Sequence, residues 1–237
     1  MRTVARGVAA SGAILFALLA YAYLTLPDVR PLRLANPPTT AFMELRAQEA
    51  RALGRVPRRV QRWVTYQHIS PDLKRAVLVA EDDAFWQHEG VDLEQLQESL
   101  EADVARGRWF RGGSTITQQL AKNLYLSPSK NPLRKIRELI LARRLESTLK
   151  KARILELYLN VIEWGDGIYG VEAAAQTYFH VPASALGARE SALLAAAIVN
   201  PRVLNPAHPG ARLFRRQQVI LRRMGAVTPP VESVELH

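Results

Sequence analysis

Residues 70–81 have the sequence SPDLKRAVLVAE, and this stretch is the clearest guide to the fold class. Ser70 followed by Pro71 is a typical helix start, because a hydroxyl caps the helix and proline suits its first position. Leu73, Val77 and Ala80 then recur at helical spacing and form one apolar stripe. The stretch therefore predicts an α-helix that buries one face.

The rest of the chain continues this helical pattern. We expect further helices at 41–52, from Asn131-Pro132 onward, at 152–161, at 171–179 and at 189–199, and a last amphipathic helix that uses Leu213, Ile220, Leu221 and Met224. Alternation typical of strands is scarce, and Trp63–Ile69 is the only fair candidate. The predicted fold class is therefore mainly all-α.

Composition narrows the classes of partner. The chain has 237 residues, enough for one well-packed domain with an appendage. It has no cysteine, which excludes a disulfide scaffold and a thiolate metal site. A net charge of +10 favours polyanions, but aromatics are only 7% and no nucleic-acid recognition module is visible, so nucleic acid is not expected. The alternative is that the arginine content is merely compositional.

The N-terminus predicts a membrane anchor. No charged side chain occurs from Gly7 through Pro27, and a bilayer-spanning helix needs about 20 residues. Arg2 and Arg6 precede this segment and place that end in the cytoplasm. A cleaved signal peptide is the alternative, because Ala20-Tyr21-Ala22 resembles a cleavage site. We expect an anchor at 1–27, a connector at 28–60, the main domain at 61–225 and a tail at 226–237.

Three acidic residues end the helix of the opening stretch. At helical spacing Glu81 falls beside the apolar stripe, Asp82 points away, and Asp83 lies near the other edge of the stripe. A carboxylate at the edge of a buried face has a raised pKa, which suits a general base. Spacing alone does not choose between Glu81 and Asp83. The alternative is a solvated acidic helix end.

Residues 112–123, GGSTITQQLAKN, are dense in hydrogen-bonding groups. Thr115 and Gln118 are spaced as in a capping box, so a helix is predicted to start here. Exposed N–H groups at that start would favour an anion. The candidate substrate-binding residues are Ser114, Thr115, Thr117, Gln118, Gln119, Lys122 and Asn123. Their hydroxyls and amides suit a sugar and the lysine suits a phosphate, whereas the alternative is simply a well-made helix start.

A charged patch follows on the next predicted helix. Arg134 and Glu138 share a face with Lys135 beside them, and Leu141 and Leu145 continue that face as apolar. Charges on a helix that is apolar elsewhere indicate the wall of a cleft. The alternative is an ordinary i,i+4 ion pair.

Three further patterns do not predict sites. Residues 165–170 match a dinucleotide-binding glycine pattern but follow a helix, so we expect them to shape a loop. The Ser-x-x-Lys matches at Ser127 and Ser147 lack their Lys-Thr-Gly partner. His88 has no second metal ligand at helical spacing, so no metal site is expected.

Taken in order, these motifs resemble glycosyltransferase family 51, the peptidoglycan glycosyltransferases, and among them the monofunctional members. The resemblance extends from about Trp63 to Pro209. Residues 163–173 are especially similar to the monofunctional members of Gram-negative bacteria. The motifs that carry the family resemblance are 81–90 (EDDAFWQHEG), 113–123, 134–138 (RKIRE), 154–160 (ILELYLN) and 192–195. Five motifs in the same order are highly specific.

The resemblance implies a lysozyme-like helical head with a smaller, membrane-associated jaw, and polymerisation of lipid II with loss of undecaprenyl pyrophosphate. Glu81 would be the general base, in an inverting transfer, and Glu138 the second carboxylate near the pyrophosphate. Lys122, Arg134 and Lys135 would bind the phosphates. Lys130 stands where members often carry arginine, and lysine lacks the bidentate fork of arginine.

The chemistry of the residues agrees with this expectation. A pyrophosphate leaving group needs charge stabilisation more than a proton, so one base and several cations suffice. No cofactor is expected to be required, although a divalent cation could assist at the pyrophosphate. Expected partners are lipid II, the nascent glycan strand, membrane lipids and other cell wall synthesis or division proteins, at the bacterial inner membrane with the catalytic domain in the periplasm. The rival hypotheses are a lysozyme-like peptidoglycan hydrolase and a non-enzymatic, anchored glycan-binding assembly factor.

Overall fold

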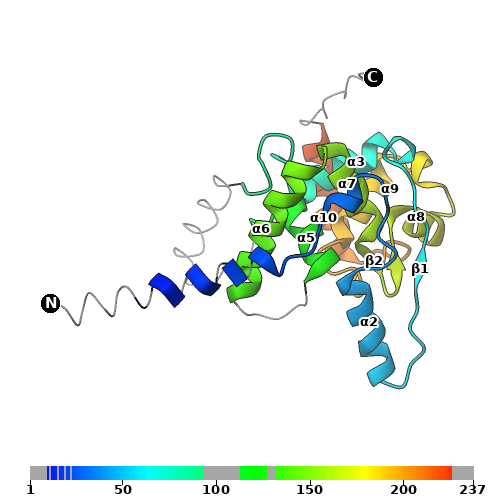
Figure 1. Cartoon of the computed structure of the whole chain (residues 1–237). Helices are drawn as coiled ribbons and strands as arrows, with labels where there is room; N and C mark the ends of the chain where they lie inside the picture. Colours follow the sequence, from blue (N-terminus) through cyan, green and yellow to red (C-terminus); the bar gives the residue numbers. More distant parts are fainter. Residues whose placement is uncertain are drawn as a thin grey trace, which may run out of the picture.

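The computed structural model describes residue 10 and residues 12–14, 16–18, 20–21, 23–92, 113–126 and 132–225. Within these ranges the chain is mainly helical, with one small sheet (Figure 1). The α-helices are α2 (Ala41–Ala52), α3 (Pro71–Glu81), α5 (Ile116–Tyr125), α6 (Pro132–Thr148), α7 (Lys151–Val161), α8 (Val171–Phe179), α9 (Ala188–Ala197) and α10 (Ala211–Met224). Short 3-10 helices lie at η1 (Arg30–Arg33), η2 (Tyr66–His68) and η3 (Ala183–Ala185).

The predicted helices are confirmed, most closely where capping and periodicity agree. Ser70 caps α3, its hydroxyl accepting a hydrogen bond of 3.2 Å from the Asp72 N–H. Leu73 and Val77 on the predicted stripe are fully buried. Helices α2 and α8 have the predicted bounds, whereas α9 ends at Ala197 rather than at Val199.

The predicted strand at Trp63–Ile69 is wrong. This segment contains η2, and side chains of α7 take two of its backbone N–H groups. The Val64 N–H donates to Asn160 Oδ1 at 2.9 Å, and the Tyr66 N–H donates to Glu156 Oε2 at 2.9 Å. Donors bound in this way are not available to a neighbouring strand.

The small sheet lies on either side of that segment in sequence. Its strands are β1 (Val60–Gln61), β2 (Glu163–Gly165) and β3 (Ile168–Tyr169), in the order β1-β3-β2. Strand β1 pairs with β3 in parallel, and β2 pairs with β3 in antiparallel fashion. Gly167 has φ 68° in the β2–β3 turn, so the expected loop-shaping role of residues 165–170 is confirmed.

Helix α5 is the helix against which α2, α6 and α7 all pack. Helix α3 packs against α9 and α10. The core contains Leu73, Leu120, Leu145, Tyr158 and Trp164, each less than 2% exposed. Helix α2 projects away from this body (Figure 1). One face of α6 therefore lies against α5, and hydrogen bonds from Ile116 and Gln119 join α5 to the end of α3.

The predicted anchor falls partly outside the described residues, as does all of the tail at 226–237. The described residues between 10 and 24 are helical, and Arg144 of α6 donates a 3.0 Å hydrogen bond to the Tyr23 carbonyl. Among the residues that the structure describes, none of the helices has both the length and the apolar character needed to span a bilayer.

Candidate active site

Glu81 is the last residue of α3 and is half-buried beside α5. The side-chain amide of Gln119 donates a 2.9 Å hydrogen bond to Glu81 Oε2. Burial raises the pKa of Glu81, although the Gln119 hydrogen bond and the charges of Arg216 and Lys122 oppose that rise. A carboxylate in this environment accepts a proton more readily than one in water.

Gln119 is itself held by Tyr158 of α7. The Tyr158 hydroxyl donates to Gln119 Oε1 at 2.9 Å, so the amide nitrogen of Gln119 must face Glu81. Tyr158 is fully buried, and burial raises its pKa well above the ordinary value, which keeps it protonated as a donor. The three side chains form one hydrogen-bonded chain from α7 through α5 to α3.

Asp82 does not point away from the core, and that expectation is wrong. Helix α3 ends at Glu81, and Asp82 leaves it with φ −168° and ψ 80°, so the helical spacing no longer applies. Its side chain is buried and accepts a 2.8 Å hydrogen bond from the Ile116 N–H. Its other oxygen lies 2.9 Å from Nε2 of His88. Asp82 therefore fastens the end of α3 to the start of α5.

This arrangement also corrects the expectation of an anion site at the start of α5. Thr115 is the N-cap as predicted, its hydroxyl accepting from the Gln118 N–H at 3.2 Å. The anion at this helix end is the Asp82 carboxylate of the chain itself. The Gln118 side chain does not complete a capping box, because it donates to the Gly90 carbonyl at 3.3 Å.

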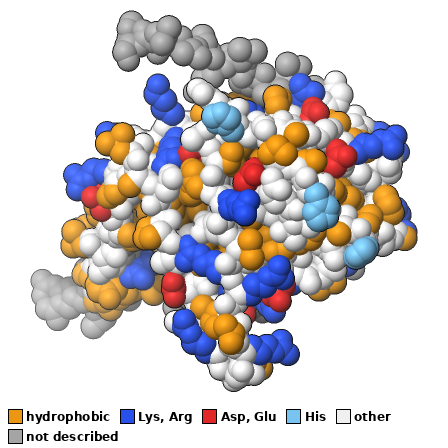
Figure 2. All heavy atoms as spheres, turned by 90° about the vertical axis from the view of Figure 1, so that its right-hand side faces the viewer, with side chains coloured by type: hydrophobic (Ala, Val, Ile, Leu, Met, Phe, Trp, Pro, Cys, Tyr) orange, Lys and Arg blue, Asp and Glu red, His pale blue; other side chains and the backbone are white. Residues whose placement is uncertain are grey.

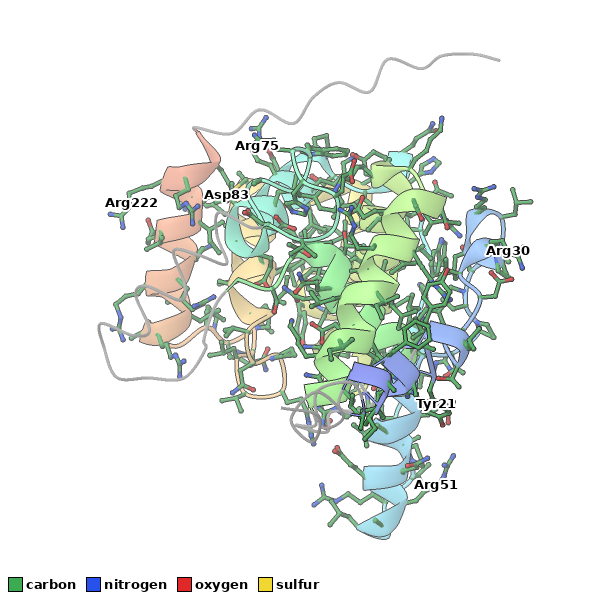
Figure 3. The ribbon with its side chains drawn as sticks, turned by 60° about the vertical axis from the view of Figure 1, so that its left-hand side comes forward. Tyr21, Arg30, Arg51, Arg75, Asp83 and Arg222 are labelled. Carbon is green, nitrogen blue, oxygen red and sulfur yellow. The ribbon has the colours of Figure 1, made fainter. Side chains whose placement is uncertain are left out.

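Asp83 differs from Glu81 in its surroundings. It lies at the surface on the side of α10 (Figure 3), where Arg223 pairs with it at 2.7 Å. Its side chain is 45% exposed. The sequence did not choose between Glu81 and Asp83. Among the described residues, the Glu81 side chain bonds to Gln119 of α5, whereas the Asp83 side chain bonds to Arg223 of α10.

The charged residues of α6 form a cluster around Glu138. Glu138 is only 3% exposed and pairs with Arg134 at 2.7 Å and with Lys135 at 2.5 Å. Lys135 also donates to Gln118 Oε1 at 3.1 Å, which joins the cluster to α5. The i,i+4 ion pair is present, and through Lys135 it is part of a polar contact between α6 and α5.

Lys122 of α5 links this cluster to Glu81 electrostatically. Burial lowers the pKa of Lys122, the charges of Glu138 and Glu81 oppose that effect, and those of Arg134 and Lys135 reinforce it. Lys122 thus experiences both candidate carboxylates. Lys130, the remaining predicted cation, lies outside the described residues.

The other predicted site residues have surroundings that differ from one residue to the next. Asn123 donates to the Gln119 carbonyl within its own helix at 2.8 Å, and Ser114 is exposed. The Thr115 hydroxyl donates to the Gly90 carbonyl at 2.8 Å. Thr117 is turned toward α6, donating to Glu146 at 2.5 Å. Thr115 and Thr117 therefore have clear structural partners.

A groove of about 280 Å³ passes along α5 and includes residues that the sequence did not single out. Gln119, Lys122, Asn123 and Tyr158 line it together with Phe42, Arg46, Ile162, Glu163 and residues 198–202. The additional residues come from α2, from β2 and from the segment after α9. Because these segments are distant in sequence, their meeting has no local signal.

Metal-binding residues are not grouped in the part of the chain that the structure describes. No set of three or more His, Cys, Asp or Glu side chains there could hold an ion. His88 bonds to Asp82 through Nε2, while its Nδ1 accepts from the Gly90 N–H at 3.1 Å. With Nδ1 as an acceptor, Nε2 is the ring nitrogen that donates to Asp82.

The chain is similar to known proteins over most of its length. A family model described as transglycosylase matches residues 49–225. A biosynthetic peptidoglycan transglycosylase of Laribacter hongkongensis is 44% identical over 97% of this chain and all of the relative. Proteins with the same name are 49% identical in Aromatoleum aromaticum and 45% in Dechloromonas aromatica, each over 82% of this chain and 84% of the relative. By these matches over most of its length, the chain belongs to the transglycosylase family.

Proposed function

We propose that this chain is a peptidoglycan glycosyltransferase that polymerises lipid II into glycan strands and releases undecaprenyl pyrophosphate. Membership of the transglycosylase family supports the reaction class. The observation that carries the proposal is the position of Glu81, half-buried and bonded to Gln119, together with Lys122, whose charge interacts both with Glu81 and with the cluster around Glu138.

Glu81 acts as the general base in this proposal. Its carboxylate removes the proton from the 4-hydroxyl of the acceptor sugar, and that oxygen attacks the anomeric carbon of the donor. The bond from this carbon to the pyrophosphate oxygen breaks, and its electron pair leaves with the pyrophosphate, with inversion at the anomeric carbon. The raised pKa of Glu81 increases its strength as a base.

The cations stabilise the leaving group. The pyrophosphate is anionic and weakly basic, so it needs positive charge rather than a proton. Lys122, Arg134 and Lys135 supply that charge, with Lys130 as a further phosphate ligand. Glu138 orients Arg134 and Lys135 through its two short ion pairs. Ser114, Thr115, Gln118, Gln119 and Asn123 complete the proposed substrate-binding set.

The remaining expectations belong to the same proposal. Residues 61–225 would form the catalytic domain, a lysozyme-like head with a smaller membrane-associated jaw, and residues 28–60 a connector. Residues 1–27 would anchor it in the inner membrane with the catalytic domain in the periplasm. The reaction requires no cofactor, although a divalent cation could assist at the pyrophosphate. The nascent strand, membrane lipids and other cell wall proteins are the proposed partners.

Incubation of the purified full-length protein with fluorescent lipid II in detergent tests the reaction. The proposal predicts a ladder of polymer on a gel that lysozyme digests. A hydrolase would instead shorten preformed glycan strands, and its activity would survive neutralisation of Lys122 and Lys135. A binding factor would produce neither result.

A further inference from the structure

A second cavity, of about 410 Å³, opens next to the groove between α2 and the β2–β3 turn. Arg46, Glu163 and Arg202 line both hollows, so the cavity continues the groove that contains Gln119 and Lys122. Helix α6, which carries the cation cluster, and helix α2 both pack against α5. The cavity therefore adjoins the groove on the side of α2 rather than on the side of α6.

The lining of the cavity includes a buried hydroxyl group that has no hydrogen-bond partner among the described residues. Tyr169 lines it and is only 1% exposed, and its hydroxyl has no hydrogen-bond partner among the described residues. The charges that act on this hydroxyl include those of Glu163, Arg46 and Asp166, which also line the cavity. Burial raises the pKa of Tyr169 above its usual range, so the group stays a donor. Buried polar groups are normally hydrogen-bonded, so the unpaired Tyr169 hydroxyl indicates that a ligand supplies its partner.

Some of the arginines around the cavity form ion pairs, and others leave positive charge at its rim. Arg46 is held by Glu49 at 2.8 Å and by Glu163 at 3.1 Å. Arg55 and Arg58 also line the cavity, are exposed, and form no ion pair within the described ranges. Their planar guanidinium groups match carboxylates.

Basic and acidic side chains gather on the face that carries α2 and β1 (Figure 2). Two apolar side chains stand among them at the cavity, Leu53 with 67% and Val56 with 91% exposure. Free cations, a buried donor and exposed alkyl groups together suit a ligand that has carboxylates, peptide groups and small apolar side chains. An inorganic anion would use only the first of these.

We propose that this cavity binds the peptide branch of the sugar-linked precursor, with a free carboxylate at Arg55 and Arg58 and a peptide carbonyl at the Tyr169 hydroxyl. The inference rests on the proposed function, because the groove must hold the sugar to which the peptide is attached. The shared lining of Arg46, Glu163 and Arg202 then gives the peptide a path from groove to cavity.

An anionic membrane surface could also attract Arg55 and Arg58. A layer of headgroups does not reach a side chain that is 1% exposed, so it leaves the Tyr169 hydroxyl unexplained. The peptide accounts for both observations.

The test compares two lipid-linked precursors, one with its complete peptide and one trimmed to the first residue of the peptide. The full-length parent, Tyr169→Phe and the Arg55→Gln/Arg58→Gln double variant are assayed for polymerisation. For the complete precursor we expect KM to rise about fivefold to tenfold in each variant, because each variant loses a hydrogen bond to the peptide. For the trimmed precursor KM should not change. Arg222→Gln, on α10 and away from the end of α2 marked by Arg51 (Figure 3), is the matched control.

A second readout separates the subsite from the reaction. Calorimetry with a soluble N-acetylmuramoyl peptide should show binding to the parent and its loss in the double variant. If the parent makes no polymer, the proposed function fails while this binding still decides the subsite. Equal KM changes for both precursors, or no binding of the muramoyl peptide, would overturn the inference. A third outcome would also overturn it: the double variant loses binding to phosphatidylglycerol vesicles, while the ratio of KM values for the complete and trimmed precursors stays unchanged. That outcome would assign the two arginines to the membrane surface.

Discussion

Gln119 donates a 2.9 Å hydrogen bond to Glu81, and the oxygen of the same amide accepts a 2.9 Å hydrogen bond from the Tyr158 hydroxyl. The three residues belong to α5, α3 and α7. The orientation of the candidate base is therefore fixed by the packing of three helices rather than by α3 alone.

The first prediction concerns the pH dependence of polymerisation. A general base works in its deprotonated form, so kcat/KM should rise with pH through the pKa of Glu81, which burial places above 4.5. Because the Gln119 hydrogen bond lowers that pKa, Gln119→Ala should move the acid limb to higher pH. Rates of lipid II polymerisation across pH measure the shift. An acid limb that stays in place or moves down in Gln119→Ala contradicts the assignment, and Tyr178→Phe, whose hydroxyl bonds to the Trp164 carbonyl, is the control.

The second prediction concerns stability. A carboxyl whose folded-state pKa is raised stabilises the fold below its unfolded pKa, and this contribution is lost as pH rises through the folded pKa. Glu81→Gln should therefore have a higher Tm than the parent at pH 7, and the difference should disappear below about pH 4.5. Thermal unfolding at both pH values checks this. A lower Tm for the variant at pH 7 would show that ionised Glu81 stabilises the fold.

The third prediction contrasts two neighbouring aspartates. Asp82→Ala removes a buried carboxylate that binds the Ile116 N–H and His88, and should cost about 2–4 kcal/mol of the free energy of unfolding. Asp83→Ala removes one exposed ion pair with Arg223 and should cost about 1 kcal/mol or less. Denaturant titration of both variants measures the difference. Similar losses in the two would be incompatible with the role given to Asp82.

The fourth prediction concerns Glu138. Glu138→Gln removes the charge that holds Arg134 and Lys135, and misplacement of such groups should lower kcat about 100-fold. Glu146→Gln is a matched control, because Glu146 is also shielded on α6 but pairs with Lys151 at 2.8 Å instead. We expect Glu146→Gln to lose stability and keep most of its kcat. Equal kcat values in the parent and Glu138→Gln would remove Glu138 from the mechanism.

Local signals predicted the helices well. The Ser70-Pro71 start of α3 and the Thr115 cap of α5 depend on residues that are adjacent in sequence, and both were found as expected. The strand pairs were not predictable in the same way. Val60 of β1 pairs with Ile168 of β3, more than a hundred positions away, in strands too short to show alternation.

The candidate site was predicted where its residues belong to local motifs, and it was missed where distant segments meet. Gln119, Lys122 and Glu138 belong to dense local motifs, and in the structure Gln119 bonds to Glu81 while the charge of Lys122 is affected by both Glu81 and Glu138. Asp82 was misjudged because its backbone leaves the helix where the periodic pattern ends. Phe42 reaches the groove through tertiary packing of α2, which no spacing in the sequence reports.

The central claim is that Glu81 is the base of a lipid II polymerase. Its most direct test is polymerisation of fluorescent lipid II by the full-length protein, by Glu81→Gln and by the exposed-site control Asp83→Asn, read on a gel. The account predicts lysozyme-sensitive polymer from the parent and from Asp83→Asn, and none from Glu81→Gln. Polymer from Glu81→Gln at the parent rate would contradict it.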